Sequence, residues 1–166
     1  MSITIIAAIG KNRELGKKGD LIWHIPEDLK YFKEKTIGKT IVMGKNTFNS
    51  LPKLLPGRKH IILSEDNDFN KDIGDSKVFH DKEELMNYLN TEFKNEEVFI
   101  TGGASMYSMF IDICDKMYLT KIMAEDKDAD AYFPKFDEND WYAGIEKECV
   151  STNVLAIHTW WKRRNK

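Results

Sequence analysis

Apolar residues recur along the chain in short runs, separated by segments rich in Gly, Pro and charged residues. Short, nearly continuous apolar runs are typical of strands that are buried on both faces of a sheet. The first run, ITIIAAI, is interrupted by a single Thr. The pattern predicts strands at residues 3–9, 40–44, 60–64, 78–80, 97–103 and 116–124.

Segments with helical spacing of apolar residues lie between these runs. The stretch LIWHIPEDLKYFKEKT, residues 21–36, reads as the beginning of an amphipathic helix, with Pro26 near the first helical position, where its missing N–H costs nothing. Further helices are predicted at residues 46–51, 81–90 and 104–113. Strands that alternate with helices indicate an α/β fold with a mostly parallel, doubly wound sheet.

The last part of the chain has a different pattern. YAGIEKECVSTNVLAIHTWWKRR, residues 142–164, reads as two strands around the Ser-Thr-Asn turn at 151–153, which predicts an antiparallel hairpin at one edge of the sheet. Residues 10–20 and 66–76 are predicted to be loops, because they are polar and rich in turn-forming residues. The length suggests one domain over residues 1–166.

The charge composition argues against a nucleic-acid-binding protein. The formal net charge is −2, whereas such proteins normally carry a basic excess or a basic stripe. Lys162, Arg163, Arg164 and Lys166 form a basic cluster near the C-terminus, and we expect a solvated tail there. The N-terminal apolar run is too short to span a membrane and lacks the basic flank and cleavage site of a signal peptide.

The two cysteines, Cys114 and Cys149, are far apart and form no CxxC pair. We therefore expect reduced thiols in a cytoplasmic protein, with no zinc or other metal site and no membrane or nucleic-acid partner. The histidines share no spacing with a nucleophile, and no Ser stands in a GxSxG context. A histidine as catalyst is therefore not expected.

Two predicted strand-to-helix junctions carry glycines: MGKNT at residues 43–47 and TGGASMY at residues 101–107. Ligands of open α/β sheets bind beyond the carboxyl ends of the strands. A helix N-terminus offers free N–H groups to an anion, and Gly lets a phosphate approach the backbone closely. Two such junctions suit the two ends of a dinucleotide, although each one alone is more typical of a tight structural turn, since neither is a GxGxxG or Walker motif.

Asp28 and Arg58 are the candidate charges for binding a ligand. Asp28 shares a helix face with Tyr31 and Phe32, and a carboxylate on an apolar face has a raised pKa and needs a hydrogen-bonding partner. A ligand with adjacent N–H donors would provide that partner; the local alternative is a first-turn acid that interacts with the helix dipole. Arg58 lies in a turn, where it either pairs with a carboxylate ligand or is solvated.

In combination, these segments resemble the dihydrofolate reductase family, in its bacterial chromosomal type. The motif W-x-x-P-x-D-L-x-x-F at residues 23–32 is followed by M-G-x-x-T-x-x-S at 43–50, L-P-G-R at 55–58 and the Gly pair at 102–103, and the likeness extends over nearly the whole chain. It implies an eight-stranded, mostly parallel sheet with helices on both faces. It also implies reduction of 7,8-dihydrofolate to tetrahydrofolate with NADPH.

The resemblance implies that Asp28 binds the 2-amino group and N3 of the pterin and promotes protonation of N5 through a water. Thr120 would support this carboxylate by a hydrogen bond, Trp23 would hold an ordered water, and Leu21 completes the implied catalytic set. Arg58 would bind the α-carboxylate of the glutamate tail. The implied lining of the substrate cleft is Ile6, Ala8, Leu29, Phe32, Ser50, Leu51 and Leu55.

For the cofactor, the resemblance implies a cis peptide between Gly102 and Gly103, a helix that faces the pyrophosphate, and a nicotinamide near Tyr107. Residues 15–21 would form a mobile loop that closes over the nicotinamide. The implied cofactor-binding residues are Ala8, Leu15, Gly16, Gly19, Asp20, Leu21, Gly44, Lys45, Asn46, Thr47, Leu63, Ser64, Glu65, His80, Thr101, Gly102, Gly103, Ala104, Ser105, Met106 and Tyr107.

Three positions depart from the commonest family pattern. Thr101 replaces a bulky apolar residue, Ser105 stands where some members have Arg, and Glu65 stands where neutral or basic residues are frequent. These departures leave Lys45 as the clearest cation for the 2′-phosphate of NADPH, with His80 as a helper. Preference for NADPH over NADH is therefore expected to depend mainly on Lys45.

Two other functions stay open at this point. One is a related NADPH-dependent reductase on the same fold that acts on a pyrimidine intermediate of riboflavin synthesis, and the other is a non-catalytic nucleotide-binding module. Asp28 and Arg58 argue against the first, and the complete pterin-facing set argues against the second. The expected partners are dihydrofolate and antifolates of the 2,4-diaminopyrimidine type. We expect a monomer, because no hydrophobic excess requires a partner chain.

Overall fold

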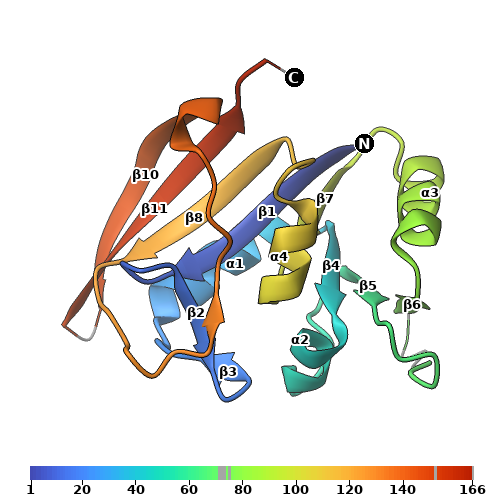
Figure 1. Ribbon diagram of the computed structural model, residues 1–166, viewed down its shortest axis with the longest axis horizontal. Helices are drawn as coiled ribbons and strands as arrows, with labels where there is room; N and C mark the ends of the chain where they lie inside the picture. The colour runs from blue at the N-terminus through green and yellow to red at the C-terminus, as the bar shows by residue number, and fades with distance from the viewer. Residues whose placement is uncertain (71–73, 75, 152, 166) are drawn as a thin grey trace.

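The computed structural model describes residues 1–70, 74, 76–151 and 153–165, and an eight-stranded sheet forms its centre (Figure 1). The strands of this sheet are β1 (Ser2–Ile9), β4 (Thr40–Gly44), β5 (Lys59–Leu63), β6 (Lys77–Phe79), β7 (Glu97–Ile100), β8 (Lys116–Ile122), β10 (Trp141–Ser151) and β11 (Val154–Arg163). Their order is β10-β11-β8-β1-β7-β4-β5-β6.

Most of this sheet is parallel. The pairs from β6 across to β8 are all parallel, whereas β11 pairs antiparallel with β8, and β10 pairs antiparallel with β11. The predicted mostly parallel sheet with an antiparallel C-terminal hairpin is therefore confirmed. Within the turn of that hairpin, Thr152 lies outside the described residues.

Helices cover both faces of the sheet, as predicted. They are α1 (Pro26–Thr36), α2 (Lys45–Ser50), α3 (Lys82–Glu92) and α4 (Ala104–Phe110), with the 3-10 helix η1 (Glu138–Asp140) before β10. Side chains of α3 and α4 pack with Ile3 and Ile5 of β1, whereas side chains of α1 and α2 pack with Ile6. Because neighbouring residues of a strand point to opposite faces, the two helix pairs lie on opposite sides. Figure 1 shows α1 behind the sheet and α4 in front of it.

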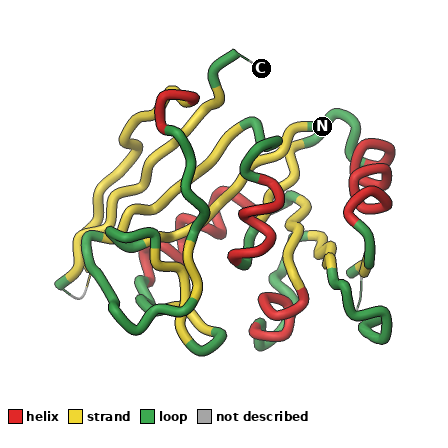
Figure 2. Tube along the Cα trace, in the orientation of Figure 1, coloured by secondary structure: helices red, strands yellow, loops and turns green. Residues whose placement is uncertain are grey.

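The segment predicted as a loop at residues 10–20 contains strands, so this prediction was wrong. β2 (Glu14–Lys17) pairs antiparallel with β3 (Asp20–Leu21) and with β9 (Ala131–Tyr132), which gives a second, three-stranded sheet. The partner strand β9 is more than a hundred residues away in the sequence, so local polarity could not reveal the pairing. Figure 2 shows that a long loop connects β8 to β9.

Three predicted elements are shorter in the structure. The strand predicted at 116–124 ends at Ile122. The strand predicted at 97–103 ends at Ile100, because the following Thr-Gly-Gly segment crosses from β7 to α4. The helix predicted at 104–113 ends at Phe110. Arg163 accounts for this end, since its guanidinium donates to Ile111 O and, over 2.8 Å, to Cys114 O, and so binds the carbonyls that follow the helix.

The prediction of a solvated tail was wrong for Arg163, which is half-buried, whereas Lys162 and Arg164 are exposed. The guanidinium of Arg163 lies 4.3 Å from the ring centroid of Trp141, and Arg164 Nε donates to Trp141 O over 3.1 Å. Lys166 lies outside the described residues, as do residues 71–73 and 75 of the predicted polar loop. No helix in the described part of the chain is long and apolar enough to cross a membrane.

Candidate functional site

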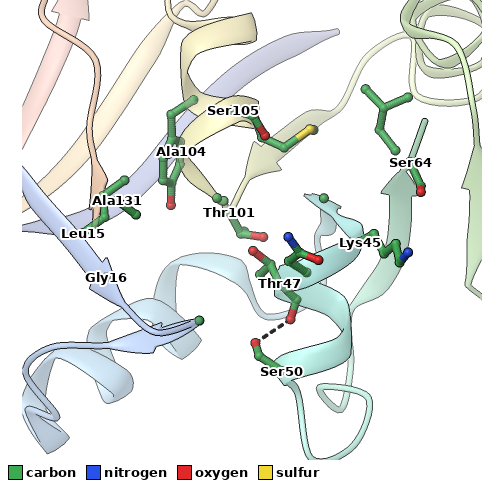
Figure 3. A pocket seen from close by; sticks show the side chains of 18 of the residues that line it. Leu15, Gly16, Lys45, Thr47, Ser50, Ser64, Thr101, Ala104, Ser105 and Ala131 are labelled. Atoms are coloured by element: carbon green, nitrogen blue, oxygen red, sulfur yellow. Dashed lines mark hydrogen bonds between the residues drawn. The ribbon is translucent and has the colours of Figure 1, made fainter. Parts of the chain in front are cut away.

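A cavity of about 890 Å³ lies beyond the carboxyl ends of β1, β4, β5 and β7 (Figure 3). The β2–β3 segment forms one wall, and α2, β5 and the start of α4 form the other walls. This is the position where open α/β sheets bind their ligands. Every residue implied above for cofactor binding lines this cavity. Further lining residues are Lys17, Ser50, Asp66, Asp81, Lys82, Met109, Asp130 and Ala131.

The two glycine-bearing junctions are bonded to each other. Gly44 N donates to Gly102 O over 2.9 Å, and Thr101 N donates to a carbonyl of β4 over 2.9 Å. The peptide bond between Gly102 and Gly103 is cis, as the resemblance implied. Gly102 has a φ of +124°, and a Cβ at this position would lie 3.3 Å from the Tyr107 hydroxyl. At Gly44, Gly102 and Gly103 the junctions thus present bare backbone to the cavity.

Charged groups of both signs meet at the end of the cavity beside β5. Lys45 Nζ lies 2.9 Å from Asp66 Oδ2, so the cation expected to read a 2′-phosphate is paired with a carboxylate. Ser64 joins this group, since Asp66 N donates to its Oγ over 3.2 Å and His80 Nδ1 donates to its carbonyl over 2.8 Å. Sequence reasoning missed Asp66, because a polar loop residue carries no signal of its partner.

The wall formed by β2 and β3 is fastened to the segment around β9. Lys18 N donates to Asp130 Oδ2 over 2.9 Å, and Asp130 N donates to Gly16 O over 3.1 Å. Glu14, only 1% exposed, accepts a hydrogen bond from Asp126 N over 2.8 Å. These two carboxylates hold the segment that was expected to be a mobile loop. Sequence reasoning missed both, because their partners lie more than a hundred residues away.

Asp28 lies in the first turn of α1, beside β8. Thr120 Oγ1 donates to its Oδ1 over 2.7 Å, and the Asp28 side chain is 20% exposed. Burial raises the pKa of the Asp28 carboxyl, and the hydrogen bond from Thr120 and the nearby His158 ring oppose part of this rise. The structure therefore brings together Asp28 and Thr120, as the resemblance implied, and adds His158, which sequence reasoning had passed over.

Apolar side chains predicted for the substrate cleft gather between α1 and α2. Phe32, Leu51 and Leu55 pack against a buried cluster that contains Ile6 and Phe48. The buried Tyr107 hydroxyl donates to the carbonyl at residue 6 over 2.7 Å, which links this cluster to α4 at the cavity. Four residues of the predicted lining, Ile6, Phe32, Leu51 and Leu55, therefore belong to one apolar cluster.

The other predicted residues have three kinds of placement. Ala8, Ser50 and Leu21 line the cavity itself. Trp23 packs against a separate apolar cluster that contains Ile25, and Ala8 packs against the same cluster. Leu29, on the same helix as Asp28, is 53% exposed, so about half of this residue is accessible to a ligand.

Arg58 lies away from the cavity, at the far end of α1. Its Nε donates to Pro56 O over 3.1 Å, and its Nη1 donates to Thr36 Oγ1 over 3.2 Å. Thr36 follows Asp28 by eight residues, which corresponds to about 12 Å along a helix. An elongated ligand that lies along α1 would therefore meet the Asp28 carboxylate at one end and the Arg58 guanidinium at the other. Among the described residues, no group of three or more His, Cys, Asp or Glu is arranged to hold a metal ion.

Comparison with known proteins gives one consistent family. A family model described as dihydrofolate reductase matches residues 2–158. The dihydrofolate reductase of Bacillus subtilis (strain 168) is 40% identical over 141 residues, which are 84% of this chain and 79% of that protein. That of Staphylococcus aureus (strain Mu50 / ATCC 700699) is 36% identical over 161 residues, which are 96% of this chain and 95% of that protein.

A solved structure agrees in fold over the full length. It is dihydrofolate reductase from Enterococcus faecalis complexed with NADP(H) and RAB-propyl, and it superposes with a TM-score of 0.84 at 30% identity. The match covers 99% of this chain and 97% of that chain. The chain therefore belongs to the dihydrofolate reductase family of NADP-dependent oxidoreductases.

Proposed function

We propose that this chain reduces 7,8-dihydrofolate to 5,6,7,8-tetrahydrofolate with NADPH and so serves the one-carbon metabolism behind thymidylate and purine synthesis. The observation that carries the proposal is the Asp28 carboxyl, mostly buried and hydrogen-bonded to Thr120, on the helix whose other end holds Arg58. Family membership supplies the reaction class, and the pair Asp28 and Arg58 supplies the reason to expect a pterin that carries a glutamate.

The cavity suits a dinucleotide. Its volume of about 890 Å³ lies within the usual range of ligand pockets, and its floor at the two junctions is glycine backbone. A Cβ on Gly44 would lie 3.4 Å from Met106 Cγ, and one on Gly103 would lie 3.6 Å from Thr47 Oγ1, so side chains here would narrow the space for phosphates. When bound, NADPH supplies the hydride. Lys45, Thr47 and Ser64 are proposed to hold its adenosine end.

Asp28 is proposed to bind and orient the pterin. An ionised carboxylate offers two acceptor oxygens, which match adjacent N–H donors such as the 2-amino group and N3. Thr120 occupies one lone pair of Oδ1, which fixes the rotation of the carboxylate. The same negative charge raises the affinity of the pterin for a proton, so N5 is more readily protonated by water.

The remaining roles follow from placement. Leu29, Phe32 and the apolar surface between α1 and α2 are proposed to exclude water from the pterin, and Arg58 is proposed to bind the α-carboxylate of the glutamate through a two-pronged hydrogen bond. Antifolates with a 2,4-diaminopyrimidine ring would use Asp28 in the same way. A single domain, a monomeric state and a cytoplasmic location stay predictions from the sequence.

The decisive test is the oxidation of NADPH, followed by its near-ultraviolet absorbance, with and without dihydrofolate. We expect turnover that depends on dihydrofolate and is blocked by a 2,4-diaminopyrimidine. Asp28→Asn should lower turnover at neutral pH by about a hundredfold or more while leaving NADPH binding unchanged, because the pterin loses its charged partner. NADPH binding without any turnover would instead indicate a nucleotide-binding module, and turnover of an aminopyrimidine substrate alone would indicate the related reductase.

A further inference from the structure

Behind Asp28 and Thr120 lies a third polar side chain, that of His158. In the antiparallel pairing of β11 with β8, His158 stands directly opposite Thr120, and it is completely buried. Its Nδ1 lies 2.7 Å from Thr120 Oγ1, and the same oxygen lies 2.7 Å from Asp28 Oδ1. One hydroxyl is therefore shared between a carboxylate and an imidazole, and it has a single proton to donate.

The direction of these two hydrogen bonds follows from the chemistry of the three groups. An ionised carboxylate can only accept, so Thr120 must give its proton to Asp28. The Thr120 oxygen can then only accept a hydrogen bond from His158. The Nδ1 atom of His158 must therefore carry the proton that it donates. In the opposite tautomer, Nδ1 would take the Thr120 proton, and the carboxylate would face an oxygen lone pair. The tautomer of His158 is thus linked to the charge on Asp28.

The surroundings of His158 hold it neutral and in place. Burial lowers the pKa of His158; the negative charges of Asp28, Glu146 and Glu27 oppose this, and Lys147, its cross-strand neighbour on β10, adds to it. The ring stacks on Tyr31 with the centroids 3.9 Å apart.

Cys149 contacts the other ring nitrogen, and Glu146 and Lys35 hold the stacked Tyr31. Nε2 lies 4.0 Å from the thiol of Cys149, which can donate to the free lone pair. Tyr31 in turn donates to Glu146 over 2.5 Å, and Lys35 Nζ pairs with Glu146 at 2.7 Å. Glu146 is the extra residue of a bulge in β10, and the bulge directs its side chain towards α1. The imidazole is therefore held at both ring nitrogens and by the stacked Tyr31 ring.

We propose that His158 is a positioning residue for the reaction: its Nδ1–H holds the Thr120 oxygen from behind, so that the Thr120 proton points at Asp28 and stabilises the ionised carboxylate that binds the pterin. This inference rests on the proposed function for its consequence in turnover. Hydrogen bonds in a row polarise one another, so the donor behind Thr120 strengthens the bond in front of it. His158 itself does not touch the substrate.

Two substitutions separate this role from simple packing. His158→Phe keeps an aromatic ring against Tyr31 but removes the Nδ1 donor, whereas His158→Asn places an amide N–H close to the position of Nδ1 and should restore it. Trp160→Phe, a half-exposed aromatic residue on the same strand, is the matched control. For each variant, the pKa of the Asp28 carboxyl group is measured by NMR from the chemical shift of its carboxyl carbon. The pH profile of kcat/KM is measured with dihydrofolate.

In His158→Phe we expect the Asp28 pKa and the whole pH profile to move to higher pH by about half a unit to one unit, the size of one net hydrogen bond. His158→Asn and Trp160→Phe should stay close to the wild type. Superimposable Asp28 titrations in the wild type and His158→Phe would overturn the proposal, as would an equal shift in the Trp160 control. If His158→Phe does not fold, the imidazole ¹⁵N spectrum of the wild type decides: a proton on Nε2 at neutral pH contradicts the inference.

Failure of the proposed function would look different. If dihydrofolate were not the substrate, the wild type would show no turnover with it, yet the Asp28 titration and the His158 tautomer would still be measurable in the free protein. The positioning of Asp28 by His158 is therefore tested whether or not the substrate has been identified correctly.

Discussion

Lys45 Nζ lies 2.9 Å from Asp66 Oδ2, at the end of the cavity where the adenosine 2′-phosphate is proposed to bind. Lys45, which is expected to bind the phosphate, is thus already paired with a carboxylate. Glu65 and Asp81 add further negative charge to the same wall of the cavity. Lys45 lowers the pKa of Asp66 through their hydrogen bond, so the carboxylate is ionised at neutral pH. We therefore expect Asp66 to compete with the phosphate for Lys45.

The first prediction concerns this competition. Asp66→Asn should tighten NADPH binding by about twofold to tenfold, because it removes both the competing partner of Lys45 and a repulsive charge, and it should change NADH binding little. Lys45→Ala should weaken NADPH far more than NADH. The dissociation constants of both cofactors, measured by quenching of Trp fluorescence, test this. Asp68→Asn, a neighbouring exposed acid, is the control, and equal effects on NADPH and NADH would exclude a role in reading the 2′-phosphate.

The parts of the site that local sequence predicted are those built from short segments. The two glycine junctions needed only a strand end, a glycine and a helix start, and the structure places Gly44 and Gly102 within a hydrogen bond of each other. The face of α1 that carries Asp28 and Phe32 follows from helical spacing alone. Family resemblance then supplied roles that spacing could not, such as the contact of Thr120 with Asp28.

The parts that were missed depend on pairings between distant segments. His158 meets Thr120 only because β11 pairs with β8 in one register, and a shift by one residue would turn the imidazole to the other face of the sheet. Asp130 binds Lys18 across 112 residues, and Arg163 reaches the end of α4 across about fifty. The residue type and the local sequence pattern do not indicate such partners, because a polar residue with a distant partner has the same local sequence context as one that is solvated.

A second prediction concerns the wall of the cavity formed by β2 and β3. Asp130→Ala removes the acceptor of Lys18 N and should loosen this segment, so NADPH should dissociate about fivefold to tenfold faster, the effect of about 1 kcal/mol from one lost hydrogen bond. Stopped-flow displacement of NADPH measures the rate. Asp128→Ala is the control, because that side chain is 82% exposed and makes one long ion pair with Lys17 at 3.8 Å. Unchanged dissociation in Asp130→Ala would show that this bond does not hold the wall closed.

A third prediction concerns the buried hydroxyl of Tyr107. It donates to Ile6 O over 2.7 Å, at a point where the pairing of β1 with β7 has already ended at Ile5. Tyr107→Phe should therefore lower the free energy of unfolding by about 1–2 kcal/mol, the cost of leaving a buried carbonyl without its donor. Urea titration measures this. Tyr132→Phe removes a comparable bond to Ala129 O from a side chain that is 42% exposed and should cost almost nothing, so similar losses in both variants would contradict the explanation.

The last prediction follows from the raised pKa of Asp28. Because the folded protein binds the Asp28 proton more tightly than the unfolded chain does, stability falls as the pH rises from the unfolded pKa to the folded one, and the ionised carboxylate destabilises the free protein at all higher pH values. Asp28→Asn should thus raise the Tm of the free protein at neutral pH by about a few °C, and the difference should vanish in acid, below the unfolded pKa, where both side chains are uncharged. Differential scanning calorimetry across this pH range tests the sign. A variant that is less stable than the wild type at neutral pH would contradict this prediction. It would show that the hydrogen bond from Thr120 outweighs the cost of burial, so that the ionised Asp28 carboxylate does not destabilise the free protein.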